Sequence, residues 1–210
     1  MTDLAALSAA IGSGDRSSAT RIVTGAIEEG TSPQTILDTM TQAMHEVGQR
    51  FSRNEIFVPE MLIAARAMKE AMAILEPLLV DAGIAPEVTA VLGTVKGDLH
   101  DIGKNLVGMM WKGANFRVID LGTNVDPQGF ARAAVEHDAR IVGASALLTT
   151  TMVGMRDVIA AVRATGRQVA VIVGGAPVTE EFARSIGADG YAPDAATAVT
   201  VARAALGITA

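Results

Sequence analysis

The second part of the chain alternates short apolar runs with amphipathic stretches, and this alternation limits the possible folds more than any other feature. The apolar runs have strand length and cover residues 88–95, 116–121, 140–146 and 168–173, with a weaker run at 189–191. Stretches with helical spacing lie near residues 102–114, 127–138, 150–165, 179–186 and 194–206. Strands that are apolar throughout are buried on both faces, as in a parallel sheet covered by helices. We therefore predict an α/β domain with a doubly wound, five-stranded parallel sheet.

The first 80 residues have a different texture, in which apolar residues recur every three or four positions. Ser32 and Pro33 are typical of a helix start, and apolar residues at helical spacing follow from Ile36 to Phe51 and from Val58 to Leu79. Two shorter helices are predicted at about 3–11 and 16–29, so we expect a four-helix bundle. A Gly- and Pro-containing break then separates the two parts. The predicted domains are a helical cap at 1–82, a linker at 83–87 and the α/β domain at 88–210.

Composition excludes several classes of protein. The 210 residues contain no cysteine, which rules out disulfides, thiolate metal sites and iron–sulfur clusters. The net charge is −6 and no basic run occurs, which argues against nucleic-acid binding. No apolar stretch is long enough to cross a membrane, and the N-terminus lacks the features of a signal peptide. We expect an intracellular, cytoplasmic protein that binds neither nucleic acid nor membranes.

Ligands of doubly wound sheets bind outside the carboxyl ends of the strands, so the loops there are the candidate site. In the loop after the first strand, His100 lies between Asp98 and Asp101. An isolated loop histidine is more often an ordinary surface residue, and His45 and His137 are interpreted in this way. Zinc would need three or four protein ligands, which this sequence does not supply. A metal held by a macrocycle needs only one axial ligand, and His100 with an acidic partner could provide it.

Nucleotide sites and catalytic triads are poorly supported. Gly93, Gly97 and Gly103 do not have the G-x-G-x-x-G spacing of dinucleotide-binding loops. Gly103 and Lys104 are followed by Asn105, which departs from the phosphate-binding pattern G-x-x-x-x-G-K-[ST]. No serine stands in a G-x-S-x-G elbow.

The loop residues resemble a known family. Asp98 to Gly103 reads D-L-H-D-I-G and is similar to the D-x-H-x-x-G signature of cobalamin-binding domains, which have a Rossmann-like (flavodoxin-like) fold. Ser145-Ala146-Leu147 is similar to the S-x-L element of that family, and Gly174-Gly175 to its paired glycine. Residues 34–80 also resemble the helical cap of the members that carry methyl groups. The likeness is greatest to the corrinoid proteins of methanol, methylamine and methoxyaromatic methyltransferase systems, and the cobalamin module of methionine synthase is a more distant relative.

The resemblance implies a role for each matching residue. His100 would be the lower ligand of cobalt, Asp98 would hydrogen-bond its other ring nitrogen, and Ser145 would continue that hydrogen-bond path. Gly103, Gly143 and the paired glycines would let the cofactor's nucleotide tail approach the backbone. The predicted cofactor-binding residues are Gly97, Asp98, Leu99, His100, Asp101, Ile102, Gly103, Ser145, Leu147, Thr149, Gly174, Gly175, Tyr191, Met61 and Met68.

Some of these assignments have an equally ordinary alternative. Thr149 and Tyr191 are as easily a helix-capping residue and a strand-end residue. Met61 and Met68 are most simply core residues, although in the family some cap residues, with Phe57 or Leu62, would shield the methyl group.

The resemblance also implies a function. The protein would bind cobalamin with the cofactor's own base displaced, and would carry a methyl group on cobalt. The methyl group would come from a substrate-specific methyltransferase and pass to a second methyltransferase with tetrahydrofolate or a thiol as acceptor, with a reductive activator as a further partner. The chain would then be a methyl-carrier subunit rather than a complete enzyme. Two alternatives remain: the small subunit of an adenosylcobalamin-dependent mutase, and a cobalamin-based sensor.

Overall fold

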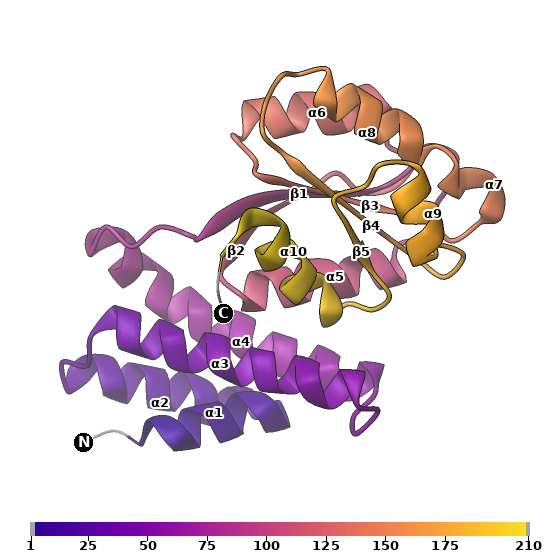
Figure 1. Cartoon of the computed structure of the whole chain (residues 1–210). Helices are drawn as coiled ribbons and strands as arrows, with labels where there is room; N and C mark the ends of the chain where they lie inside the picture. Colours follow the sequence, from indigo (N-terminus) through magenta and orange to yellow (C-terminus); the bar gives the residue numbers. More distant parts are fainter. Residues whose placement is uncertain (1–2, 209–210) are drawn as a thin grey trace. The chain divides into compact units, whose positions relative to one another are not determined.

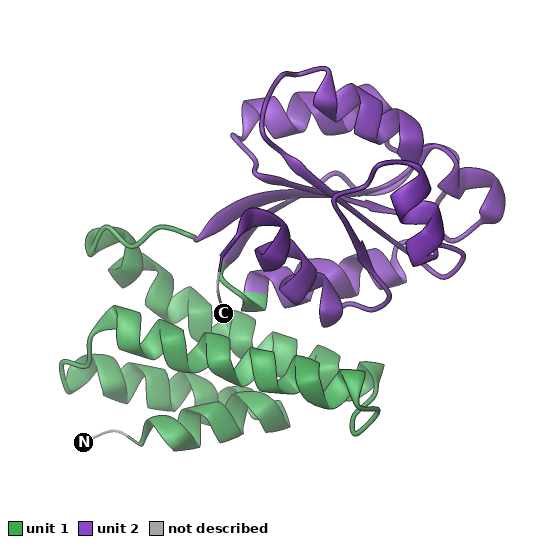
Figure 2. Ribbon diagram, viewed as in Figure 1, with its two compact units in different colours: residues 1–86, 113–115 green, residues 87–112, 116–210 purple. Residues whose placement is uncertain are grey.

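The structure is a computed structural model that describes residues 3–208 (Figure 1). It divides into two compact units, which Figure 2 shows in green and purple. One is a helical unit formed by the first 86 residues together with the short turn at 113–115, and the other is an α/β unit formed by residues 87–112 and from 116 onward.

The helical unit contains four helices, as the sequence predicts. They are α1 (Leu4–Ser13), α2 (Arg16–Glu28), α3 (Pro33–Ser52) and α4 (Val58–Asp81). Asp3, Asp15 and Ser32 cap the first three, each accepting a hydrogen bond from a backbone N–H of the first helical turn. Glu60 caps α4, because its side chain accepts from the backbone N–H of Phe57 at 3.1 Å.

The core of the helical unit is apolar. Each helix buries the face that its sequence period predicts, and the largest fully buried side chains are Leu7, Ile11, Ile36, Leu37, Met40, Met44, Met61 and Leu75. An ion pair on the surface joins α2 to α4, with Arg16 Nη1 2.9 Å from Glu70 Oε1. Exposed pairs of this kind stabilise little, so apolar burial holds the unit together.

The α/β unit contains five parallel strands, β1 (Val88–Thr94), β2 (Phe116–Asp120), β3 (Ile141–Ser145), β4 (Ala170–Gly174) and β5 (Gly190–Ala192). Their order in the sheet is β2-β1-β3-β4-β5, which is the flavodoxin-like order. The helices are α5 (Ile102–Gly113), α6 (Pro127–Glu136), α7 (Thr149–Met152), α8 (Met155–Arg163), α9 (Glu180–Ser185) and α10 (Thr197–Leu206). The predicted fold class is confirmed. The strand order reverses at β1, so the loops after β1 and β3 diverge at this point of the sheet.

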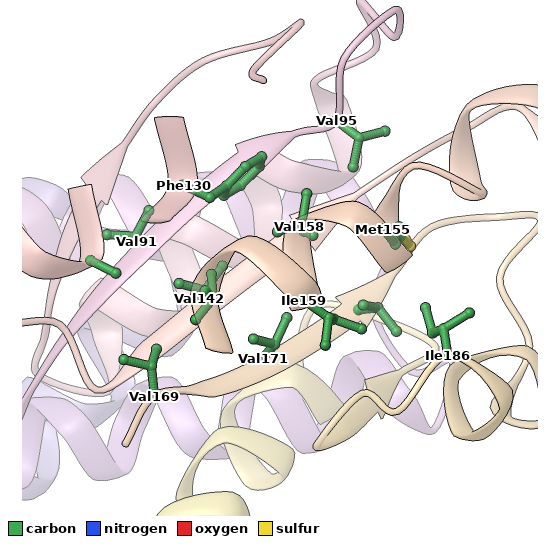
Figure 3. Packing of buried hydrophobic residues seen from close by; sticks show 14 of the residues in the cluster. Val91, Val95, Phe130, Val142, Met155, Val158, Ile159, Val169, Val171 and Ile186 are labelled. Atoms are coloured by element: carbon green, nitrogen blue, oxygen red, sulfur yellow. The ribbon is translucent and has the colours of Figure 1, made fainter. Parts of the chain in front are cut away.

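Helices cover both faces of this sheet. Figure 1 shows α6 and α8 on one face and α5 and α10 on the other. On the first face a cluster of buried apolar side chains joins the sheet to its helices, including Val91, Val142, Val171, Phe130 and Met155 (Figure 3). On the other face Trp111 is fully buried and donates its indole N–H to the carbonyl of Ala198 at 3.1 Å.

One predicted helix is divided in the structure. The sequence predicts a single helix at 150–165, whereas α7 ends at Met152 and α8 begins at Met155. Three consecutive threonines and Gly154 lower the helix propensity of this segment, which explains the break. The short α7 therefore forms a separate turn directly after the loop of β3.

Among residues 3–208, no helix combines the length and the apolar content that crossing a membrane requires.

Candidate functional site

Buried polar side chains are concentrated in one place. Among the described residues, the polar or charged ones that are buried are Thr94, Asp98 and Lys104. All three lie within eleven positions, in the end of β1, the loop that follows it and the first turn of α5. Burying polar groups is costly unless their hydrogen bonds are satisfied, so a cluster of this kind marks a structure that is specifically stabilised.

Asp98 is fully buried, and both of its carboxylate oxygens are occupied. Oδ1 accepts the backbone N–H of His100 at 3.0 Å and lies 3.0 Å from His100 Nδ1. Oδ2 accepts the backbone N–H of Leu147 at 2.7 Å and the hydroxyl of Thr151 at 2.8 Å. The carboxylate therefore joins the loop after β1 to the loop after β3.

These contacts decide the charge state of Asp98. Burial by itself would raise the pKa of this carboxyl. The hydrogen bonds from the Leu147 and His100 amides, the Thr151 hydroxyl and the His100 ring outweigh burial and hold the pKa of Asp98 well below its usual value. Asp98 is thus a carboxylate at neutral pH, and a carboxylate is only an acceptor.

The negative charge of Asp98 decides which nitrogen of the His100 ring carries the proton. Because Asp98 can only accept, the proton of the neutral imidazole must be on Nδ1, and Nε2 has a free lone pair. The His100 side chain is 54% exposed. Within residues 3–208 no group forms a hydrogen bond to its Nε2. The ring is therefore held on one side and available as a metal ligand on the other.

Backbone contacts hold the same loop. The hydroxyl of Thr94, which is fully buried, donates to the carbonyl of His100 at 2.9 Å. The side chain of Asn124, in the loop after β2, accepts the N–H of Gly97 at 2.8 Å, and its backbone N–H donates to the carbonyl of Asp98 at 3.0 Å. Gly97 has φ +84°, a conformation that glycine adopts readily.

Large apolar side chains near His100 are unusually exposed. Leu99 and Ile102, on either side of it in sequence, are 74% and 75% exposed, and Leu147 and Leu148 after β3 are 42% and 43% exposed. Leu99 lies in the loop after β1, Ile102 begins α5 directly after that loop, and Leu147 and Leu148 lie in the loop after β3. Contiguous exposed apolar side chains mark binding surfaces, so these four are candidates to contact a ligand held at His100. A half-exposed imidazole with apolar side chains in the same two loops suits a large flat ligand with a metal at its centre.

The hydroxyl that hydrogen-bonds Asp98 belongs to Thr151, which was not a predicted site residue, and the role of Ser145 stays a prediction. Ser145 was expected to extend the hydrogen-bond path from Asp98, but the described residues show no hydrogen bond from its side chain to that carboxylate; Thr151 provides it instead. Ser145 ends β3, whereas α7 brings Thr151 back over the loop. The signal in the sequence was a hydroxyl in the first turn of the helix predicted after this strand, two positions beyond Thr149.

Three of the four glycines predicted to line the cofactor groove are also needed by the packing of the protein itself. A Cβ at Gly143 would lie 2.7 Å from Trp111, one at Gly174 2.7 Å from the Ala192 carbonyl oxygen and one at Gly175 1.9 Å from that of Ala146. The packing of the protein itself therefore requires these three glycines, and contact with a cofactor remains a prediction for Gly174 and Gly175. A Cβ at Gly103 would meet nothing within 4 Å, so this position alone of the four is open to a ligand.

The remaining predicted residues are scattered. Asp101 is exposed and accepts the side-chain amide of Asn105 at 3.0 Å. Thr149 begins α7 and is exposed, while Tyr191 in β5 is half-buried against the apolar cluster. Met61 and Met68 are buried on α4, at 1% and 4% exposure, and their contact with a cofactor stays a prediction.

An ordinary metal site is absent from the part of the chain that the structure describes, since no three His, Cys, Asp or Glu side chains are grouped to hold an ion. A site with His100 as its single protein ligand is compatible with this finding, because a macrocycle occupies the other positions of its metal.

Comparisons with known proteins identify the family. A family model described as a B12 binding domain matches residues 88–200, and a second model with the same description matches residues 4–76. The chain belongs to the cobalamin-binding corrinoid proteins. It is 41% identical over 178 residues to a corrinoid protein of Desulfitobacterium hafniense, covering 82% of each chain. It is 42% identical over 163 residues to dimethylamine corrinoid protein 3 of Methanosarcina mazei, covering 76% of this chain and 98% of the relative.

Solved structures agree with this assignment to the corrinoid proteins. A cobalamin-binding protein from Desulfitobacterium hafniense superposes with a TM-score of 0.83 at 31% identity, covering 98% of this chain and 99% of the other. A chain of the methanol:cobalamin methyltransferase complex from Methanosarcina barkeri gives 0.84 at 27% identity, covering 98% and 80%. The cofactor of this corrinoid protein is a cobalamin, and His100, Gly103 and the exposed leucines fit such a group.

Proposed function

We propose that this corrinoid protein binds cobalamin with the cofactor's own base displaced and His100 Nε2 as the lower ligand of cobalt. The observation that carries the proposal is the His100 ring itself. Its Nδ1 is fixed by a buried carboxylate, while the side chain is 54% exposed and Nε2 forms no hydrogen bond within residues 3–208. The exposed apolar side chains of Leu99, Ile102 and Leu147 would contact the corrin ring around this ligand.

When bound, the corrin supplies a cobalt ion that accepts a methyl group and gives it up again. The residues of the protein hold the imidazole and its proton. Asp98 keeps one proton on Nδ1 through the whole cycle, because its four hydrogen-bond donors favour the carboxylate. Thr151 and the Leu147 amide keep the carboxylate in place whether or not Nε2 is bound to the metal.

We further propose that the chain is a methyl carrier between two enzymes. A substrate-specific methyltransferase would load the methyl group, and a second methyltransferase would pass it to tetrahydrofolate or a thiol. A reductive activator would restore the cofactor after accidental oxidation. The support is the similarity to dimethylamine corrinoid proteins and to a chain of the methanol:cobalamin methyltransferase complex. The donor, the acceptor and these partners are part of the proposal.

Electron paramagnetic resonance of the cobalt(II) form tests the ligand. Protein labelled with nitrogen-15 and loaded with unlabelled cobalamin should show the nitrogen-15 splitting pattern, since the axial nitrogen belongs to the protein. His100→Ala should show the unlabelled pattern of the cofactor's own base, or none. His137→Ala is the matched control, because this residue lies at the end of α6 and should leave the spectrum unchanged. An unlabelled pattern in the wild type would overturn the assignment of His100.

Methyl transfer is tested separately. The protein in its methylcobalamin form should lose the methyl group to a thiol or tetrahydrofolate only when an acceptor methyltransferase is added. If the isolated protein is found to carry an adenosyl group instead of a methyl group or water, the methyl-carrier role is wrong even though the cofactor site stands.

A further inference from the structure

Lys104 is a buried cation for which the proposed mechanism has no use. Its side chain is 2% exposed, although it begins in the first turn of α5, four residues after His100. Its ammonium group lies 2.7 and 2.6 Å from the two carboxylate oxygens of Asp120 and 2.7 Å from Asn105 Oδ1. A lysine is rarely buried without a specific partner, so the arrangement calls for a function.

One hydrogen-bond path leads from Lys104 to the residue after His100. The Asn105 amide oxygen accepts from Lys104 Nζ, and its Nδ2 donates to Asp101 Oδ2 at 3.0 Å. The backbone N–H of Asn105 also donates to the carbonyl of Asp101 at 2.7 Å. The ammonium group therefore fixes the Asn105 side chain, and Asn105 holds Asp101 through its side-chain amide and its backbone N–H.

A second path leads from Lys104 to His100 itself, through the loop after β2. Asp120 Oδ1 accepts both Lys104 Nζ and the backbone N–H of Gly122, the latter at 2.9 Å. The carbonyl of Gly122 accepts the N–H of Thr94 at 2.9 Å, and the Thr94 hydroxyl donates to the carbonyl of His100 at 2.9 Å. The two paths thus reach His100 and its neighbour through different segments, one within the first turn of α5 and one through the loop after β2.

The charge of Asp120 suits this role. Partial burial raises the pKa of its carboxyl, but hydrogen bonds from Lys104 and the Gly122 amide hold it below the usual value. Asp120 is 42% exposed in its side chain, whereas Lys104 is enclosed. Burial of the Lys104 ammonium group is therefore tolerated only because its partners are present. Together with Asp120 it forms a charge-assisted contact between α5 and the end of β2.

We propose that Lys104 is a positioning residue for His100, because its buried ammonium group is the common origin of two hydrogen-bond paths that end at His100 and Asp101. It acts through other residues and does not touch the cofactor. This inference rests on the proposed function of His100 as a cobalt ligand. The geometry of the loop in the protein without cofactor provides a test that is independent of this function.

Three variants test the proposal. Lys104→Met keeps the length of the side chain and removes the charge. Asp120→Asn keeps an acceptor for the Gly122 amide and weakens the hold on the lysine. Arg163→Met is the matched control, because Arg163 pairs with Asp189 at 3.1 Å and with the Gly187 carbonyl at 2.9 Å, before β5 at the amino edge of the sheet.

Two measurements apply to each variant. In the protein without cofactor, hydrogen exchange of the His100 backbone amide reports its hydrogen bond to Asp98. In the loaded protein, the affinity for cobalamin and the nitrogen coupling of cobalt(II) report the position of the ring. Lys104→Met should exchange this amide faster and bind cobalamin about 10-fold more weakly, as for the loss of an outer-shell partner of a metal ligand. Asp120→Asn should change both in the same direction by less, and Arg163→Met should change neither.

The outcomes separate the possible explanations. If Lys104→Met lowers the melting temperature but keeps wild-type exchange and affinity, Lys104 only joins α5 to the sheet and the proposal is wrong. If Lys104→Met does not fold, Asp120→Asn decides by the same two measurements. If the wild type shows no protein nitrogen on cobalt, the function proposed for His100 fails, while the exchange measurement still tests whether Lys104 holds the loop.

Discussion

The two units of the protein bury different kinds of side chain. The helical unit buries apolar residues, and none of the buried residues described in it has a polar side chain. The α/β unit has an apolar core too, but it also encloses Thr94, Asp98 and Lys104 around the loop that carries His100. Apolar packing tolerates many sequences, whereas a buried polar network is stable only when every partner is present. The contrast indicates that the chemistry belongs to the α/β unit.

The largest expected effect concerns the apolar core of the helical unit. Leu75→Ala removes a fully buried side chain of α4 and should lower the free energy of unfolding by about 2–5 kcal/mol. Urea denaturation followed by circular dichroism measures it. Cobalamin affinity, measured under conditions where the variant is folded, should stay within about twofold of wild type, because His100 and its hydrogen-bond partners lie in the α/β unit. A tenfold loss of affinity would correspond to about 1.4 kcal/mol. A large loss of affinity in the folded variant would contradict the separation of roles.

A smaller effect is expected at the centre of the polar cluster. Asp98→Asn puts a donor where the carboxylate now accepts four hydrogen bonds, and should cost about 1–3 kcal/mol at neutral pH. Urea denaturation at pH 7 measures the loss, and a stability equal to that of the wild type would contradict it.

The same variant should change the pH dependence of stability. Folding lowers the pKa of Asp98, so its contribution is complete above the pKa of an unfolded aspartate, about 3.9, and is lost as the pH falls toward the lower value of the folded state. The wild type should therefore lose more stability than Asp98→Asn when the pH falls below about 4. Parallel pH profiles of the two proteins would show that Asp98 is not held as a carboxylate.

Two hydroxyl variants compare the expected residue with the one that the structure shows. Thr151→Val keeps the shape and removes the hydrogen bond to Asp98, at a cost of about 1 kcal/mol. Ser145→Ala should cost less than about 0.5 kcal/mol, because within residues 3–208 its hydroxyl forms no hydrogen bond with that carboxylate. Thermal denaturation and the cobalt(II) spectrum should both show the larger change for Thr151→Val. The reverse order would restore Ser145 to the path.

The smallest effect on stability is expected at Gly103. Its added Cβ meets nothing within 4 Å, and alanine is favoured over glycine inside a helix by about 0.5–1 kcal/mol. Gly103→Ala should therefore leave stability unchanged or raise it slightly. It should nevertheless weaken cobalamin binding, because the methyl group would occupy space predicted for the cofactor's nucleotide tail. Unchanged affinity in a titration would place the cofactor away from this turn.

Much of the fold was predictable because its signals are local. The periods of the apolar residues predict four helices and five strands, and the helix start at Ser32 and Pro33 is visible in the sequence. The break between α7 and α8 was missed, since weak helix propensity sets it and not a change of period. The candidate site was predicted in part: a hydrogen bond between the His100 ring and Asp98 was expected, and Nδ1 of the ring donates to Asp98 Oδ1.

By itself, the sequence determined which elements form and which loop carries the histidine, because both depend on residues close together in the chain. Only the tertiary structure decided the partners of that loop. Thr151 and Leu147 reach Asp98 because β3 pairs with β1, where Thr94 is opposite Ser145. Asp120 lies near Lys104 because β2 pairs with the other edge of β1. Strand order brings together groups from separate loops, and no local pattern records which strands are neighbours.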